Sequence, residues 1–130
     1  MITTCIPASG KTYFLERALN DQFALALYTS EADLGKDTKA YTSLGEVRGK
    51  GYKAGGLSLK NPKVWLDRGA ACLTFDSPTI PVATLTARGF MVYCKTQQNR
   101  AIFVGDWSGD YTSTEGPFRV PIAADLIVFD

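Results

Sequence analysis

The sequence contains no histidine among its 130 residues. Histidine is the commonest general base and the commonest nitrogen ligand of metals, so its absence removes the easiest routes to acid–base catalysis and metal binding. A serine or cysteine nucleophile would need a lysine or a carboxylate as its base, and no local arrangement suggests such a pair. We therefore expect no catalytic residue, no cofactor-binding residue and no metal ligand, and we predict that the protein is not an enzyme.

Cysteine is also scarce, with only Cys5, Cys72 and Cys94. An odd number without CxxC spacing is a poor disulfide framework and a poor zinc site. Cys72 and Cys94 stand in apolar, strand-like surroundings, where a reduced cysteine behaves as a small hydrophobic residue. These thiols favour synthesis in the cytoplasm.

Long apolar runs and an excess of one charge are missing as well. No run approaches the roughly twenty residues that span a bilayer, and the first residues lack the pattern of a secretory signal. The net charge is +1, with both signs interspersed, whereas nucleic-acid-binding proteins concentrate basic residues on one surface. A small basic cluster at Arg48, Lys50 and Lys53 lies among glycines and indicates a solvated loop. We expect neither a membrane nor a nucleic acid as a partner.

Short strand-like segments separated by glycine-bearing turns are what the chain does contain. Three such stretches follow one another near its end, at roughly 82–95, 100–107 and 117–129. Gly89 lies inside the first of them and predicts a β-bulge or bend. Because side chains alternate between the two faces of a strand, such runs build a layered β core.

Earlier segments extend this pattern. Residues 23–30 predict a strand with Phe23, Leu25 and Leu27 on one face, and 63–67 with 70–75 predict a hairpin. Helix is expected only as short pieces, near 13–20 and 40–47. The whole predicts seven or eight strands in one all-β domain, a β-sandwich or jelly-roll-like fold, spanning 21–130.

Residues 1–20 differ from this domain and are expected to form an extended N-terminal arm. The arm carries three large apolar side chains, Tyr13, Phe14 and Leu15, on a segment too short for a core of its own. We predict that these three residues contact a partner surface. The alternative is that they close over one end of the same sandwich.

The arm also contains the strongest apparent motif, CIPASGKT at 5–12. It matches the phosphate-binding P-loop at Gly10, Lys11 and Thr12, but Cys5 stands at the first glycine position. A P-loop requires a buried strand before a glycine-rich turn whose amides face the phosphates. Only four residues precede the motif, although the segment resembles the opening of small nucleotide kinases. Nucleotide binding is therefore kept as a minor alternative.

Carboxylates and aromatic residues offer weaker candidates. Asp106 and Asp110 flank a glycine turn, as Asp33 and Asp37 do, and we interpret both pairs as capping turn amides. Four aromatic residues could form a stacking platform for sugars or bases, but aromatic residues in strands more often belong to the core. These four are Trp65, Tyr93, Phe103 and Trp107.

Five segments in a fixed order carry a family resemblance: ALYTS at 26–30, GEV at 45–47, GYKAGG at 51–56, ARGFMVY at 87–93 and NRAIFVGDW at 99–107. In this order the chain resembles small β-rich virion structural proteins of tailed bacteriophages and prophages. The resemblance covers roughly 23–115, and the first twenty residues depart from it.

This resemblance implies a non-enzymatic role in a virus particle. The first expectation is a capsid decoration or cement protein on the capsid surface, assembled in the host cytoplasm. Such a protein staples neighbouring major capsid subunits and is often a homo-oligomer, either a dimer or a trimer, with an extended terminal arm. The alternative is a tail or receptor-binding accessory module of the virion, in which Trp65 or Trp107 contacts carbohydrate.

Overall fold

A computed structural model of the protein describes residues 1–123 and 125–129. Strands account for 47 % of them, in two antiparallel sheets with little helix, so the predicted all-β class is confirmed. Along the chain the elements are α1 (Ala8–Ala18), β1 (Phe23–Tyr28), β2 (Leu57–Ser58), β3 (Lys63–Asp67), β4 (Ala70–Thr74), β5 (Thr79–Cys94), the 3₁₀ turn η1 (Lys95–Gln97), β6 (Arg100–Arg119) and β7 (Ile127–Phe129).

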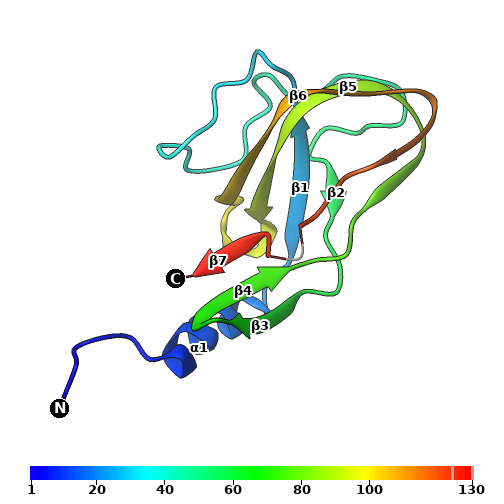
Figure 1. Cartoon of the computed structure of the whole chain (residues 1–130). Helices are drawn as coiled ribbons and strands as arrows, with labels where there is room; N and C mark the ends of the chain where they lie inside the picture. The colour runs from blue at the N-terminus through cyan, green and yellow to red at the C-terminus, as the bar shows by residue number, and fades with distance from the viewer. Residues whose placement is uncertain (124, 130) are drawn as a thin grey trace.

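The two sheets differ in size. The larger has the strand order β2-β1-β5-β6 and the smaller has the order β3-β4-β7 (Figure 1). Helix α1 contacts β3 and β4 of the smaller sheet. The smaller sheet and the helix thus lie together at the end of the molecule from which the N-terminal segment leaves (Figure 1).

Strand β1 is the centre of the core, and all six of its residues are buried. Its alternating side chains enter two apolar clusters on opposite faces of the larger sheet, which confirms the predicted alternation. The principal cluster, between the two sheets, receives Phe23, Leu25 and Leu27. The smaller cluster receives Ala24, Ala26 and Tyr28.

Strands β5 and β6 form one long, curved hairpin within the larger sheet, and it turns at 95–99 (Figure 1). The pairing shifts register between Ala87 and Gly89, which confirms the bulge predicted at Gly89. A side chain at Gly89 would clash with the carbonyl of Gly105, so glycine lets the two backbones approach. The predicted strand 100–107 is part of a longer one, and the prediction of one strand over 117–129 is wrong. Its first residues complete β6 and its last form β7.

The predicted hairpin of 63–67 with 70–75 is confirmed in β3 and β4. Asp67 pairs with Ala70, which leaves Arg68 and Gly69 as a two-residue turn. Both turn residues have positive φ, 51° and 83°. This geometry matches the right-handed twist of the flanking strands and explains the tight connection.

The helix predictions were only partly correct. The arm does contain a helix, but it spans Ala8–Ala18 and not 13–20. It begins directly after Pro7, whose backbone is extended, and proline is tolerated at the start of a helix. The helix predicted over 40–47 is wrong. That segment instead makes isolated bridges, with Tyr41 N–H donating to Asn99 O and Glu46 pairing with Tyr28. No helix in the described chain is both long and apolar enough to cross a membrane.

Candidate interaction surface

Helix α1 is held against the body of the protein at two places. Near its start, Lys11 Nζ donates to the carbonyl of Gly69 in the β3–β4 turn at 3.2 Å. Near its end, Leu15 and Ala18 pack against the principal core. The helix contains no fully buried residue. The face that carries Leu15 and Ala18 covers the end of the core, and the opposite face is exposed to solvent.

The three residues predicted to contact a partner do not all face the same way. Leu15 is half-buried against the protein's own core, as the alternative interpretation of the arm described. Tyr13 and Phe14 are 55 % and 54 % exposed. Phe14 stacks on Phe129 of β7 with ring centroids 6.3 Å apart, and Tyr13 meets Phe14 edge-on at 5.5 Å. Tyr13, Phe14 and Phe129 thus form one exposed aromatic group, and the sequence did not predict that Phe129 belongs to it.

The outer face of the smaller sheet is also apolar at its centre. Trp65, Cys72 and Val128 are neighbours in register across β3, β4 and β7, so their side chains share one face. Cys72 is buried, whereas Trp65 and Val128 are 40 % and 50 % exposed. This exposed tryptophan contradicts the interpretation of Trp65 as a core residue.

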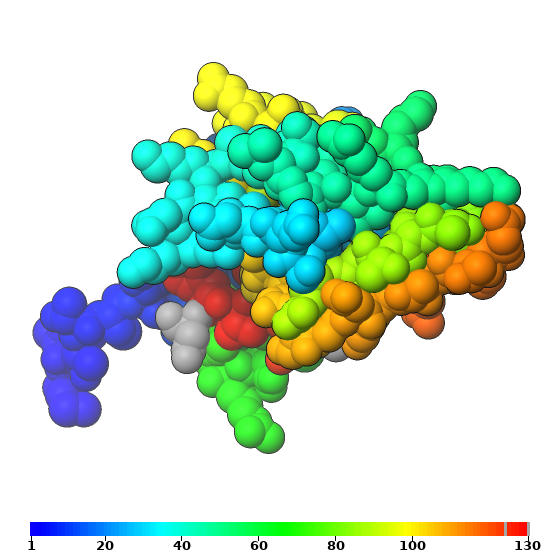
Figure 2. All heavy atoms as spheres, turned by 90° about the horizontal axis from the view of Figure 1, so that it is seen from above, coloured from blue at the N-terminus to red at the C-terminus, as the bar shows by residue number. Residues whose placement is uncertain are grey.

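Residues 1–6, which we call the leading segment, extend beyond α1. All six are exposed. Two perpendicular views show the segment projecting from the body (Figure 1 and Figure 2). None of its side chains belongs to either apolar cluster of the core.

The P-loop motif does not form a phosphate cradle. The N–H groups of Gly10 and Lys11 both donate to the carbonyl of Pro7, at 2.9 and 3.1 Å. Thr12 Oγ1 lies 3.0 Å from the carbonyl of Ser9 within the same helix. A P-loop needs these amides free and directed at a phosphate after a strand, whereas here they hold the first turn of α1.

The end of the principal core opens into a cavity of about 170 Å³, which we call the end groove. It lies between α1, β7 and the start of β6. Its apolar wall includes Leu15, Ala18, Ile102 and Ile127, and its polar residues are Asp21, Gln97 and Arg100. The end groove is therefore an apolar hollow with charged groups at its edge.

A buried carboxylate, that of Glu46, is the polar feature that the sequence analysis missed. Its Oε1 accepts a hydrogen bond from Tyr41 Oη at 2.6 Å. Its Oε2 accepts from Tyr52 Oη at 2.5 Å and from Gly55 N–H at 3.0 Å. Tyr93 Oη in turn donates to the carbonyl of Gly55 at 2.6 Å. The only signal in the sequence was a lone acidic residue in the GEV segment, followed by GY.

Burial in this network suppresses ionisation of the tyrosines. Burial and the hydrogen bond to Glu46 raise the pKa of Tyr41 to about 12. The pKa of Tyr52 is raised by the same two causes. Burial first, and then the charge of Glu46, raise the pKa values of Tyr28 and Tyr93. All four tyrosines act as neutral donors: Tyr41 and Tyr52 donate to the Glu46 carboxylate, whereas Tyr28 and Tyr93 donate to the backbone carbonyls of Thr42 and Gly55.

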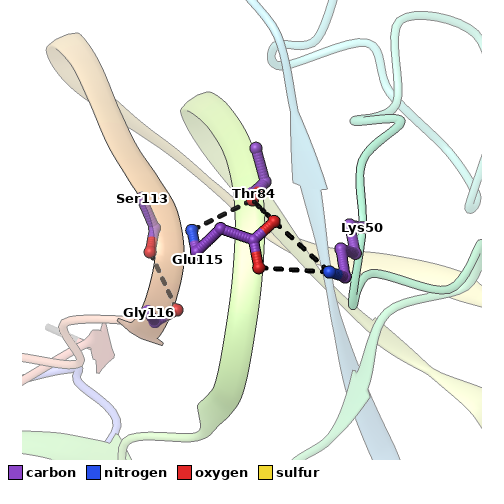
Figure 3. A network of polar contacts seen from close by, with 5 residues as sticks. All are labelled: Lys50, Thr84, Ser113, Glu115 and Gly116. Atoms are coloured by element: carbon purple, nitrogen blue, oxygen red, sulfur yellow. Dashed lines mark hydrogen bonds and ion pairs between the residues drawn. The ribbon is translucent and has the colours of Figure 1, made fainter.

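At the far end of the β5–β6 hairpin, a second polar network fastens the glycine-rich loop, residues 45–56, to the sheet (Figure 3). Lys50 and Thr84 exchange backbone hydrogen bonds at 3.1 and 3.0 Å. Lys50 Nζ also pairs with Glu115 at 3.1 Å, and Glu115 N–H donates to Thr84 Oγ1 at 3.0 Å. Arg48 and Lys53 are exposed beside it, which fits the predicted solvated loop.

The remaining candidates are structural. Asp106 Oδ1 accepts from Ser108 N–H at 2.8 Å, which confirms that this carboxylate caps a backbone amide, but the turn predicted at 106–110 is wrong because these residues lie within β6. That hydrogen bond, followed by the interaction with Arg88, lowers the pKa of Asp106. Tyr93 is buried, and Phe103 and Trp107 pack against the core, as expected of strand aromatic residues.

Among the described residues, no group of three or more cysteine, aspartate or glutamate side chains is placed to hold a metal ion. Comparison with known proteins gave no match to a family model, to a curated protein or to a solved structure.

Proposed function

We propose that the protein is a non-enzymatic structural component of a tailed-phage particle, namely a capsid decoration protein on the capsid surface. In this role a β-sandwich or jelly-roll-like body, made in the host cytoplasm, staples neighbouring major capsid subunits. The observation that carries the proposal is the exposed pair Tyr13 and Phe14, held on a helix fixed to the body. The resemblance of 23–115 to small virion proteins supports the same role.

A decoration protein needs contact groups with a fixed position. Large exposed aromatic side chains are typical anchors of protein interfaces, because they bury much area at little cost in side-chain entropy. Phe14 is oriented by its stacking on Phe129, and α1 is anchored by Leu15 and by the Lys11 contact. Many copies on one shell add weak contacts through multivalency, so a small aromatic surface suffices.

A decoration protein also needs a rigid body. The buried Glu46 network joins the beginning and the end of the glycine-rich loop, and Lys50, in its middle, pairs with Glu115 and Thr84 of the larger sheet. Loops without such fastening open locally at little free energy. These contacts support a role in which the body transmits force between subunits.

The proposal is tested by localising the protein in purified particles by cryo-electron microscopy and by measuring its occupancy on isolated shells. We expect density at symmetry-related sites between major capsid subunits. Tyr13→Ala and Phe14→Ala should each lower the occupancy, because they remove exposed anchor groups. Tyr111→Ala is the matched control, since Tyr111 is 45 % exposed on the remote part of β6. Equal occupancy of all variants would contradict the assignment of this surface.

A second candidate, a tail or receptor-binding accessory module, is favoured by the exposure of Trp65. Aromatic faces bind sugars by stacking, and Trp65 is 40 % exposed on the outer face of the smaller sheet. Trp107 is a poorer candidate because its ring already stacks on Tyr111, with centroids 5.1 Å apart and planes 2° apart. Quenching protection of Trp65 by host polysaccharide, lost in Trp65→Ala, together with density at the tail, would favour this role.

A further inference from the structure

We propose that the leading segment of one copy adds as a strand to the open side of β7 in a second copy, and that Ile2 enters the end groove. The contact joins two copies of this chain and is independent of any capsid subunit. Four observations carry it: an exposed segment outside every helix and strand, an open sheet edge, an apolar hollow beside that edge, and a helix that directs the segment outward.

The leading segment has the chemistry of an unpaired strand. It belongs to no helix or strand of its own chain, it carries no charged side chain, and four of its residues are β-branched: Ile2, Thr3, Thr4 and Ile6. Such residues favour strands. In a strand Ile2, Thr4 and Ile6 would share one face, with Thr3 and Cys5 on the other. Ile2 is 98 % exposed, so the segment has an apolar face with nothing to cover it.

Strand β7 presents the matching edge. It pairs with β4 on one side, and on its other side the described chain places no strand. Open edges carry unpaired N–H and C=O groups and readily recruit another strand. β7 has no charged residue between Ile127 and Phe129 to discourage such pairing. The edge is three residues long, and no charged side chain within it opposes an added strand.

The end groove fixes which face of the added strand points inward. Ile127 lies in register with Leu73, and both line the groove, so this row of side chains faces the core. A strand added beside β7 continues the row by one position, with an isoleucine facing Ile127 and Ile102. The cavity of about 170 Å³ admits a side chain of this size. Asp21 and Arg100 at its edge remain solvated.

The geometry assigns the segment to a second copy and not to its own chain. The segment leaves α1 at Pro7, whereas the groove is lined by Ala18 at the other end of the helix, so the segment would have to fold back along α1 to reach the groove of its own chain. It also points away from the body in both views (Figure 1 and Figure 2). Reciprocal exchange between two copies forms a closed two-fold pair and doubles a contact that is small by itself.

The full chain permits a direct test, because Cys5 is exposed and Cys72 and Cys94 are buried. Two samples are mixed. One is protein without nitrogen-15 that carries a nitroxide on Cys5, and the other is nitrogen-15 protein that carries no nitroxide. Only contacts between copies then broaden the observed amide signals. We expect broadening of β7 and of Ile102, and none of β2 in the larger sheet. The same mixture after reduction of the nitroxide gives the reference spectrum.

Substitution of the inserted residue completes the test. Ile2→Ser should weaken the association about ten-fold, because it removes an aliphatic side chain from an apolar site. Thr3→Ser is the matched control and should leave it unchanged, since Thr3 faces outward. No broadening at β7, broadening elsewhere, or equal effects of the two variants would overturn the proposal. Shell occupancy is measured separately, so this failure is distinguishable from a failure of the decoration role.

Discussion

Tyr52 and Glu46 are joined by a hydrogen bond of 2.5 Å between Tyr52 Oη and Glu46 Oε2, inside the glycine-rich loop. The same hydroxyl accepts the N–H of Leu27 at 3.0 Å. One side chain thus links a buried carboxylate to the central strand β1. Because Glu46 is buried with every hydrogen-bond partner in place, this link stabilises the loop without leaving an unpaired polar group.

Glu46→Gln should be strongly destabilising. The amide nitrogen of glutamine would face the donors Tyr52 and Gly55, or else Tyr41, so at least one buried donor would lose its acceptor. We expect the free energy of unfolding to fall by about 1–3 kcal/mol, measured by urea denaturation.

Glu115→Gln is the matched control for that measurement. Glu115 forms an ion pair with Lys50 in which both side chains are more than half exposed. Exposed pairs contribute about 0–1 kcal/mol, so the control should change stability little. Equal losses from both substitutions would contradict the role given to the Glu46 network.

The tyrosine cluster makes stability depend on alkaline pH. The pKa of Tyr41 is raised from 10.0 to about 12, and those of Tyr28, Tyr52 and Tyr93 are also raised. A raised pKa in the folded state means that the folded protein binds the phenolic proton more tightly than the unfolded chain does. The contribution is complete below about pH 10 and is lost as the pH rises through 10 toward 12 and beyond.

We therefore expect the urea midpoint to fall steadily above about pH 10. Ultraviolet absorbance of tyrosinate should show these four of the six tyrosines ionising together with unfolding. Full ionisation of all six near pH 10 in a chain that stays folded would contradict this prediction.

Gly56→Ala should disrupt the pairing of β2 with β1. Gly56 has φ +84°, and an added Cβ would clash with the carbonyl of Leu25 in the central strand. Left-handed backbone and overpacking each carry a penalty, so we expect a loss of at least about 2 kcal/mol. Gly35→Ala is the control, because nothing lies near its added Cβ. Thermal unfolding of both variants compares them, and similar melting temperatures would contradict the account.

What the sequence could predict was local. The faces of β1 and the β3–β4 hairpin depend on alternation and on one tight turn, and both were predicted correctly. The length of β6 was not, because Gly105, Gly109 and Gly116 look like breaks, whereas the partner strand β5 carries the ladder across them. Pairing with a long neighbour overrides weak local propensity.

At the candidate site, too, local features were predicted and contacts between distant segments were not. The sequence identified Tyr13, Phe14 and Leu15 as large apolar residues on a short segment, but only packing decides which of them faces the core. The stacking of Phe14 on Phe129 joins residues from the two ends of the chain and has no local signal. The three hydrogen-bond donors to Glu46 likewise come from a loop whose sequence has no periodicity.

Thiol reactivity should separate the three cysteines. Cys5 is exposed in the leading segment, whereas Cys72 and Cys94 are buried. Burial also raises the pKa of Cys72, which disfavours its reactive thiolate. We expect a colorimetric thiol reagent to modify one thiol quickly in the folded protein and all three in denaturant. The fast reaction should disappear in Cys5→Ser and persist in Cys94→Ser. Rapid modification of Cys72 in the folded chain would mean that the outer face of the smaller sheet opens far more readily than its close packing indicates.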